Sequence, residues 1–172
     1  MELVKIPSER VKFLLGDHGE TKKAIEEKCK VSLNLNEEGE VEVIGETADV
    51  FFAKDVVKAI GRGFGPQDAL KLSSDNFVLF IVNLKEHLPN EKTITRIKGR
   101  VIGEKGRMKK EIEAATESIL SVYGNTIGII AKIDTMEYAK DAILKIIDGA
   151  EHSSVYVYLS KARRQILGER LK

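Results

Sequence analysis

The feature that most limits how this chain can fold is that its sequence repeats itself once. Aligning Gly16-Asp17-His18-Gly19 with Gly103-Glu104-Lys105-Gly106 sets an offset of 87 residues. This offset, reduced to 86 by one deleted residue, aligns further residues in the same order: Leu14-Leu15 with Val101-Ile102, Lys22-Lys23 with Lys109-Lys110, Ile25 with Ile112, Val41 and Val43 with Ile127 and Ile129, Ala53-Lys54-Asp55 with Ala139-Lys140-Asp141, and Ile60 with Ile146. The pattern indicates one structural unit that occurs twice.

Each copy has the hydrophobic periodicity of the element order β-α-α-β-β-α. In the first copy we expect strands at 2–6, 31–35 and 40–44, and helices at 8–15, 20–28 and 47–60. Ser8 and Thr47 are expected to cap the first and third of these helices. In the second copy we expect strands at 77–84, 119–123 and 126–131, and helices at 92–98, 107–115 and 135–147.

The repeat predicts an α+β fold with two tandem domains, each a three-stranded antiparallel sheet packed against three helices. The expected bounds are 1–62 for the first domain, 63–76 for a connector, 77–150 for the second domain and 151–172 for a C-terminal helical extension. The extension carries Arg163, Arg164 and Arg170. Apolar residues alternate from Val155 to Leu159, so its first part also fits an extended segment.

Composition favours a folded protein inside the cell. Charged residues make up 32% of the chain and hydrophobic residues 42%, which is typical of a folded domain. No apolar run approaches the ~20 residues of a membrane-spanning helix, so we expect no membrane partner. The single cysteine, Cys29, excludes an internal disulfide and favours a buried structural thiol. A reducing, cytoplasmic location is expected.

Charge is distributed unevenly along the chain. Residues 1–86 hold 12 Lys and Arg against 16 Asp and Glu, a net charge of −4, and residues 87–172 hold 16 against 11, a net charge of +5; the two halves sum to +1. Only the second half is therefore expected to attract a polyanion strongly.

The second Gly-x-x-Gly loop, Gly103-Glu104-Lys105-Gly106, combines several features of a phosphate-binding site. Two glycines permit a tight turn and close approach of a phosphodiester backbone. The loop precedes a predicted helix, whose N-terminal N–H groups and dipole favour phosphate. Seven basic residues and one acid lie between Arg96 and Lys110. The residues that we expect to meet a nucleic acid at this loop, which the family resemblance described below assigns to RNA binding, are Arg100, Ile102, Gly103, Glu104, Lys105, Gly106, Arg107, Lys109 and Lys110.

The first loop departs from this pattern. Asp17 would place a carboxylate toward phosphate, and Lys22 and Lys23 offset that repulsion only in part. We therefore predict a weaker RNA-binding set there: Gly16, Asp17, His18, Gly19, Lys22 and Lys23. The alternative is that the acidic first domain docks a protein, such as an assembly or translation factor, with RNA secondary.

A β-α-α-β-β-α unit with Val101-Ile102-Gly103-Glu104-Lys105-Gly106 between its first two helices resembles the KH domain of the eukaryotic type (type I). That resemblance implies that the loop clamps about four nucleotides of single-stranded RNA. It also implies that the bases lie over an apolar groove that includes Ile102 and strand residues such as Ile119 and Ile129.

Two such domains in a short chain, joined by the stretch from Gly61 to Leu72, resemble the archaeal form of the ribosome-assembly factor family called "partner of Nob". The resemblance implies binding to small-subunit ribosomal RNA near its 3′ end and a link to the endonuclease that matures that end. The sequence shows no nucleotide-binding or nucleophile motif and no metal-ligand spacing around its three histidines. We therefore expect no enzymatic activity, no catalytic residue, no metal and no cofactor.

Overall fold

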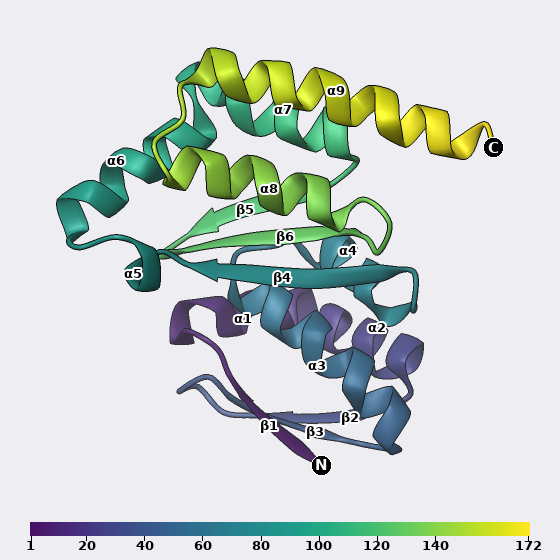
Figure 1. Ribbon diagram of the computed structural model, residues 1–172. Coiled ribbons are helices and arrows are strands. Elements are labelled where there is room, and N and C mark those ends of the chain that lie inside the picture. The colour runs from purple at the N-terminus through teal and green to yellow at the C-terminus, as the bar shows by residue number, and fades with distance from the viewer. The chain divides into compact units, whose positions relative to one another are not determined.

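The computed structural model describes all residues from 1 to 172 and divides into two units, Met1–Leu79 and Phe80–Lys172 (Figure 1). One three-stranded sheet has the order β1-β3-β2 and the other β4-β6-β5. The division falls inside β4 (Phe77–Asn83), which pairs with β6. The predicted α+β class and the predicted element order are confirmed for both copies.

The first unit follows the predicted order with small shifts at the ends of its elements. It contains β1 (Glu2–Lys5), the 3-10 turn η1 (Ser8–Arg10), α1 (Val11–Leu15), η2 (Asp17–Gly19), α2 (Glu20–Cys29), β2 (Ser32–Leu35), β3 (Glu40–Ile44), α3 (Thr47–Gly61), α4 (Pro66–Ala69) and η3 (Leu70–Ser73). The predicted capping roles of Ser8 and Thr47 are wrong. Both are already the first residue of their element, and the preceding Pro7 and Glu46 form no side-chain cap.

The register of the first sheet separates an apolar face from a polar one. Leu33 pairs with Val43 and Leu35 with Val41, so these four side chains share one face. Leu33, Val41 and Val43 are buried, whereas the alternate residues of the same strands are mainly polar and more exposed. This alternation is what a sheet covered by helices on one face requires. In the predicted connector, Phe64, Ala69 and Leu72 are also buried, so this stretch is folded as part of the first unit.

The second unit repeats this arrangement and adds one short helix after its first strand and one long helix at its C-terminal end. It contains β4, α5 (Leu84–His87), α6 (Glu91–Ile102), η4 (Glu104–Gly106), α7 (Arg107–Thr116), β5 (Ile119–Tyr123), β6 (Thr126–Lys132), α8 (Met136–Ile147) and α9 (His152–Arg170). The short helix α5 was not expected. Asparagines cap it and the following helix: Asn83 accepts the Lys85 N–H at 3.1 Å, and Asn90 accepts the Thr93 N–H at 2.9 Å.

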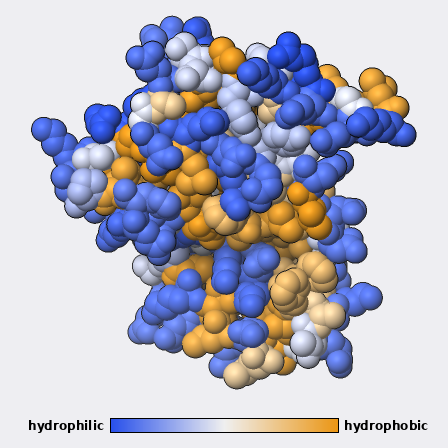
Figure 2. Space-filling view, viewed as in Figure 1, coloured by the Kyte–Doolittle hydropathy of each residue, from blue (hydrophilic) through white to orange (hydrophobic).

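The C-terminal segment is one continuous helix, α9, and the extended start that we also considered for it is absent. Its buried residues are Val155, Leu159, Ala162 and Ile166, and their spacing of three or four gives one apolar stripe. The stripe packs against α7 and α8 (Figure 1). At the top of Figure 2, where α9 runs, hydrophilic residues predominate and hydrophobic ones are scattered among them. No helix in the chain is long and apolar enough to cross a membrane.

Candidate nucleic-acid interface

The two Gly-x-x-Gly loops have the same backbone conformation. The first glycine has φ 70° at Gly16 and 76° at Gly103. The third loop residue is left-handed although it is not glycine, with φ 53° at His18 and 54° at Lys105. Such a conformation costs a non-glycine residue about 1–2 kcal/mol, and strain of this kind is typical of functional sites. The repeat has therefore preserved a strained backbone as well as a motif.

The two glycines of each loop have different roles. A Cβ at Gly16 would lie 2.3 Å from Thr21 Oγ1, and one at Gly103 would lie 2.7 Å from the Met108 nitrogen. The first glycine is thus required by the close packing of the loop on its helix. A Cβ at Gly106 would meet only the Lys110 Cε at 4.0 Å. The second glycine leaves a bare stretch of backbone that a ligand can approach.

Each loop leads into a ten-residue helix whose N-terminus has no side-chain cap, α2 in the first unit and α7 in the second. The positive end of the helix dipole therefore lies at the loop, although the first N–H of each helix, at Glu20 and Arg107, already donates to the carbonyl of Asp17 or Glu104. The first residues differ in charge, because α2 begins with Glu20 and α7 with Arg107. The carboxylate of Glu20 opposes an approaching phosphate, whereas Arg107 adds to the attraction. This difference makes the two loops more unequal than their central residues alone indicate.

The structure brings most of the predicted second-loop residues to one exposed surface. Glu104, Lys105, Arg107 and Lys110 are exposed, and Ile102 is 37% exposed although it is aliphatic. Lys109 is half-buried and lies with its Nζ 3.7 Å from Glu113 Oε1. These residues form a continuous stretch from the end of α6 to the first turns of α7.

Arg100 does not join this surface, and we remove it from the proposed RNA-binding set. Its guanidinium donates to the Ile146 carbonyl at 3.3 Å and to the Ala150 carbonyl, both at the end of α8. Its own carbonyl lies 2.9 Å from His152 Nε2. Arg100 thus adds a donor to the Ile146 carbonyl, which also accepts the Gly149 N–H at 3.1 Å, and bonds to the Ala150 carbonyl just after the helix.

The first unit has an equivalent arginine–carbonyl contact, but the arginine comes from a different position in the repeat. Arg10 donates from Nε to the Ile60 carbonyl at 2.8 Å and from its terminal nitrogen to the Phe64 carbonyl at 3.0 Å. Ile60 corresponds to Ile146 in the repeat. Arg10, however, aligns with Ile97, one helical turn before Arg100. The two units thus place an arginine at the same carbonyl from neighbouring turns of equivalent helices.

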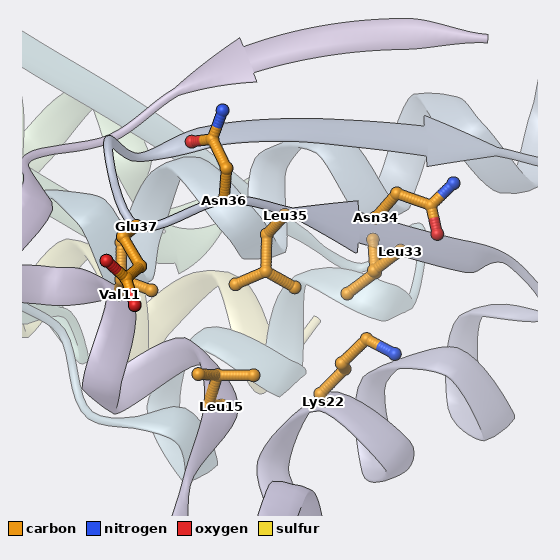
Figure 3. A pocket seen from close by; sticks show the side chains of 8 residues that line it. All are labelled: Val11, Leu15, Lys22, Leu33, Asn34, Leu35, Asn36 and Glu37. Atoms are coloured by element: carbon orange, nitrogen blue, oxygen red, sulfur yellow. The ribbon is translucent and has the colours of Figure 1, made fainter.

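A groove of about 400 Å³ runs beside the first loop (Figure 3). Its walls come from α1, the start of α2, strand β2 and the turn after it: Val11, Leu15, Lys22, Leu33, Asn34, Leu35, Asn36 and Glu37. Leu15 directly precedes Gly16 and is 36% exposed. It aligns with Ile102, which supports the predicted position of Ile102 at the apolar edge of the second loop.

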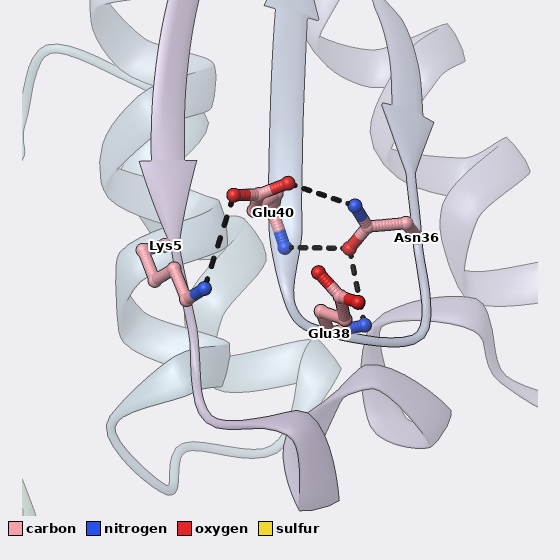
Figure 4. A network of polar contacts seen from close by, with 4 residues as sticks. All are labelled: Lys5, Asn36, Glu38 and Glu40. Carbon is pink, nitrogen blue, oxygen red and sulfur yellow. Dashed lines mark hydrogen bonds and ion pairs between the residues drawn. The ribbon is translucent and has the colours of Figure 1, made fainter.

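A hydrogen-bonded turn forms one rim of this groove (Figure 4). Asn36 Oδ1 accepts the N–H groups of Glu38 and Glu40, each at 3.1 Å. Asn36 Nδ2 donates to Glu40 Oε2 at 2.9 Å, and Lys5 Nζ lies 3.9 Å from Glu40 Oε1. An asparagine that bonds to the backbone two residues on stabilises such turns. In the second unit the turn is shorter, since Tyr123 pairs directly with Thr126. The one-residue deletion in the repeat therefore lies in this turn.

The predicted strand contribution to the groove requires a correction. In the first unit the strand residues that line the groove are Leu33, Asn34 and Leu35, and Leu33 aligns with Leu120. Leu120 pairs with Ile129, whereas Ile119 pairs with Ile130 and so lies on the opposite face of the sheet. Ile119 aligns with Ser32, which does not line the first groove, so we no longer expect it in a groove of the second unit; Ile129 is fully buried. A shift of one residue along a strand changes the face, and the sequence run Ile119-Leu120 does not specify which residue faces the helices.

Sequence reasoning missed one residue in each copy, Glu26 and Glu113. Glu26 Oε1 accepts the Leu33 N–H at 2.9 Å, and Glu113 Oε2 accepts the Leu120 N–H at 3.0 Å. Each glutamate also pairs with the lysine one turn before it on the same helix. The two glutamates are aligned by the 87-residue offset, which is the signal that would have identified them.

Comparison with known proteins agrees with this geometry. A family model described as the eukaryotic type KH-domain (KH-domain type I) matches residues 78–164, and a KH domain model matches residues 1–59. The KH domain-containing protein MJ0443 of Methanocaldococcus jannaschii is 39% identical over 171 residues, which cover 96% of this chain and 75% of that protein. A crystal structure of an a/eIF2alpha–aDim2p–rRNA complex from Pyrococcus horikoshii OT3 contains a chain that matches with a TM-score of 0.88 and 39% identity, covering 95% of this chain and 94% of that one.

The chain belongs to the "partner of Nob" family of two-KH-domain proteins. Family members in eukaryotes are longer. The pre-rRNA-processing protein PNO1 of Chaetomium thermophilum is 26% identical over 153 residues, which are 84% of this chain and 57% of that protein. The chain therefore spans little more than half the length of this eukaryotic family member.

Metal-ligating side chains and the single cysteine form no second site beside the loops. No three His, Cys, Asp or Glu side chains converge as metal ligands would. Cys29 is buried at the end of α2, and burial raises the pKa of its thiol above the ordinary value, with nearby Lys28 acting in the opposite direction. The thiol is therefore held in its neutral form, as expected for a structural cysteine.

Proposed function

We propose that this protein binds single-stranded RNA without catalysing a reaction, and that its main contact is the loop Gly103–Gly106. The phosphate backbone would pass over Gly106 and Lys105 at the uncapped N-terminus of α7, with Arg107 and Lys110 beside it. The bases would lie past Ile102 toward strand β5. The observation that carries this proposal is the strained loop with an exposed lysine at its tip, set directly on a helix N-terminus.

The RNA that we propose is small-subunit ribosomal RNA near its 3′ end, bound during ribosome assembly. Two observations support this choice. Relatives carry the names pre-rRNA-processing protein and RNA-binding protein, and the aDim2p chain that resembles this one was crystallised in a complex that contains rRNA. The position near the 3′ end follows from the family resemblance.

We propose a smaller contribution from the first unit. Its loop has the same backbone and its groove is open, but Asp17 and Glu20 place two carboxylates around the phosphate path. Lys23 reduces this repulsion, Lys22 lies in the lining of the groove beside the loop, and Gly16, His18 and Gly19 supply the same shape as the second loop. The first unit is therefore expected to hold RNA that the second unit has already bound.

A protein partner is a second part of the proposal. The Pyrococcus complex contains a/eIF2alpha as well as rRNA. The first half of the present chain carries a net negative charge, which repels RNA but can attract a basic protein surface. We propose the α subunit of the translation initiation factor as one partner. The endonuclease that matures the 3′ end is proposed from the family resemblance alone.

The test of the main site is the paired substitution Glu104→Asp and Lys105→Asp in the full chain. It keeps the glycines and places two short carboxylates at the phosphate path, so affinity for a 3′-end rRNA fragment should fall by well over a factor of ten, about 1.4 kcal/mol or more. Fluorescence anisotropy measures the affinity, and circular dichroism verifies the fold.

The matched control is His18→Asp, which gives the first loop the same Asp-Asp pair and should weaken binding less. Unchanged affinity of the Glu104→Asp and Lys105→Asp protein would show that RNA binds elsewhere. A larger loss in the control would move the main site to the first unit.

A further inference from the structure

Both units contain the same three-residue contact between the helix after the loop and the strand opposite it. In the first unit Lys22 Nζ lies 3.2 Å from Glu26 Oε1, and that oxygen also accepts the Leu33 N–H at 2.9 Å. In the second unit Lys109 Nζ lies 3.7 Å from Glu113 Oε1, and the other oxygen accepts the Leu120 N–H at 3.0 Å. All three residues of one contact align with those of the other.

These pairs are better shielded than an ordinary surface ion pair. The side chains of Lys22 and Lys109 are 32% and 35% exposed, and those of Glu26 and Glu113 are 24% and 23% exposed. The carboxylate has a fixed position because it also holds a strand N–H. It therefore holds the ammonium in place, in contrast to the neighbouring Lys23 and Lys110, which are exposed on the helix surface.

The location of Lys22 determines which part of a bound RNA would lie near its ammonium group. Lys22 lies in the lining of the groove, beside Leu15 and below Leu33 in Figure 3, rather than in the loop itself. If RNA binds as proposed above, the phosphates follow the loop and the flat, partly apolar bases enter the groove. The ammonium then faces the edge of a base. Its partner carboxylate neutralises much of its long-range attraction for phosphate, but at least one of its three N–H donors stays available.

We propose that Lys22 and Lys109 read a nucleobase edge instead of binding phosphate, and that Glu26 and Glu113 are positioning residues that hold them there. Because an ammonium group only donates hydrogen bonds, it favours a base that presents a carbonyl oxygen. Guanine and cytosine have one carbonyl oxygen and uracil has two, whereas adenine offers only ring nitrogens as acceptors, so the groove position should disfavour adenine. This inference rests on the proposed RNA-binding function.

The test uses the full chain and pools of random RNA decamers in which one position is fixed as A, C, G or U. The variants are Lys22→Ala and Glu26→Gln in the first unit and Lys109→Ala and Glu113→Gln in the second. Glutamine still accepts the strand N–H but loses the charge that holds the lysine. Glu27→Gln and Glu111→Gln are the matched controls, because each removes one carboxylate from the same helix; Glu111 pairs with Arg163 instead of a groove lysine.

For the wild-type protein, we expect discrimination against adenine at one position for each unit. Each lysine variant should reduce that discrimination by up to about tenfold, with the slope of log affinity against log salt unchanged. Each Glu→Gln variant should also reduce it, and should make the slope steeper, because the released lysine reaches phosphate. The controls should retain the wild-type base preference.

A phosphate contact gives the opposite result. Lys→Ala would then lower affinity for all four bases equally and reduce the slope by about 0.7, and the inference would be wrong. Failure of the proposed function would look different, because binding would then not respond to the loop substitution at Glu104 and Lys105. Binding that depends on that loop but shows no adenine discrimination in the wild-type protein overturns only the present inference.

Discussion

At the scale of single residues, the non-glycine residues with positive φ occur as two aligned pairs. His18 and Lys105 lie at the tips of the loops, and Lys30 and Glu117 lie at the C-terminal ends of α2 and α7. The first pair lies where a ligand is expected. The second pair ends a helix in the left-handed conformation that glycine usually provides. The same backbone conformation therefore shapes a candidate binding loop in the first pair and ends a helix in the second.

The substitution Lys30→Gly should stabilise the protein. Lys30 has φ 58°, and glycine adopts this conformation without the steric cost of about 1 kcal/mol that a Cβ brings. The free energy of unfolding of the first unit, measured by urea denaturation, should rise by about that amount. Lys28→Gly, two residues earlier and inside the helix, should lower it by about 1 kcal/mol. Equal effects of the two substitutions would contradict this account of the helix end.

At this scale the sequence predicted the loop conformation at the glycines but not the structural contacts of Arg100. The glycines are identified by their spacing and by the basic, helix-forming residues after them. Arg100 stands among seven basic residues, and its position in the sequence resembles that of a phosphate ligand. Its role depends on the carbonyls of Ile146 and Ala150, which lie about fifty residues further along the chain. No local pattern reports such a contact.

At the scale of elements, the last helix of each repeat is held at its C-terminal end by an arginine from the first helix of that repeat. The contact closes the order β-α-α-β-β-α, because it joins the helix before the loop to the final helix. In the second unit it is reinforced at α9, where His152 meets the Arg100 carbonyl. A basic residue at a helix C-terminus also interacts favourably with the helix dipole.

Arg100→Ala should destabilise the second unit without changing its intrinsic RNA affinity. Loss of two hydrogen bonds from a charged, half-buried donor should lower the free energy of unfolding by about 2 kcal/mol. The exposed Arg96 on the same helix is the matched control, and its alanine variant should change stability by less than about 0.5 kcal/mol. Thermal unfolding and RNA titration at a temperature where both variants are folded measure the two effects. A selective loss of RNA affinity for Arg100→Ala would restore it to the RNA-binding set.

Most elements were predictable because their periodicity is strong, and the exceptions have physical reasons. The β5–β6 hairpin follows from the Gly124-Asn125 turn between two apolar runs. The start of α9 was ambiguous because Val155 and Leu159 fit both a period of two and a period of four. The helix is selected by packing on α7 and α8, which the sequence does not describe. The capping errors at Ser8 and Thr47 are one-residue shifts.

At the scale of the whole molecule, the repeat offers two copies of one loop with different charges. The backbone angles of His18 and Lys105 differ by 1°, so side chains from one loop should fit the other. The two loops then differ mainly in charge, as do the two halves of the chain, with net charges of −4 and +5. The charge difference was predictable from the sequence, whereas the matching backbone angles of the two loops were not.

Exchange of the loop residues should strengthen the weaker copy. The substitutions Asp17→Glu and His18→Lys give the first loop the sequence of the second. They add one positive charge at the phosphate path, so affinity for single-stranded RNA should rise several-fold and the salt slope should steepen by about 0.7. Anisotropy titrations at several salt concentrations measure both. Adding Glu20→Arg should increase the effect, and no gain from all three substitutions would show that the first loop does not meet phosphate.

The buried cysteine has a practical consequence. Cys29 is the only thiol in the chain, it lies at the end of the helix that starts at the first loop, and its pKa is raised by burial. Alkylating reagents react with thiolates, so burial and the raised pKa should slow the reaction of the folded chain, and opening of α2 should speed it. The rate at which Cys29 is labelled reports local opening there, and its response to RNA distinguishes ligand bound to the first loop from ligand bound only to the second.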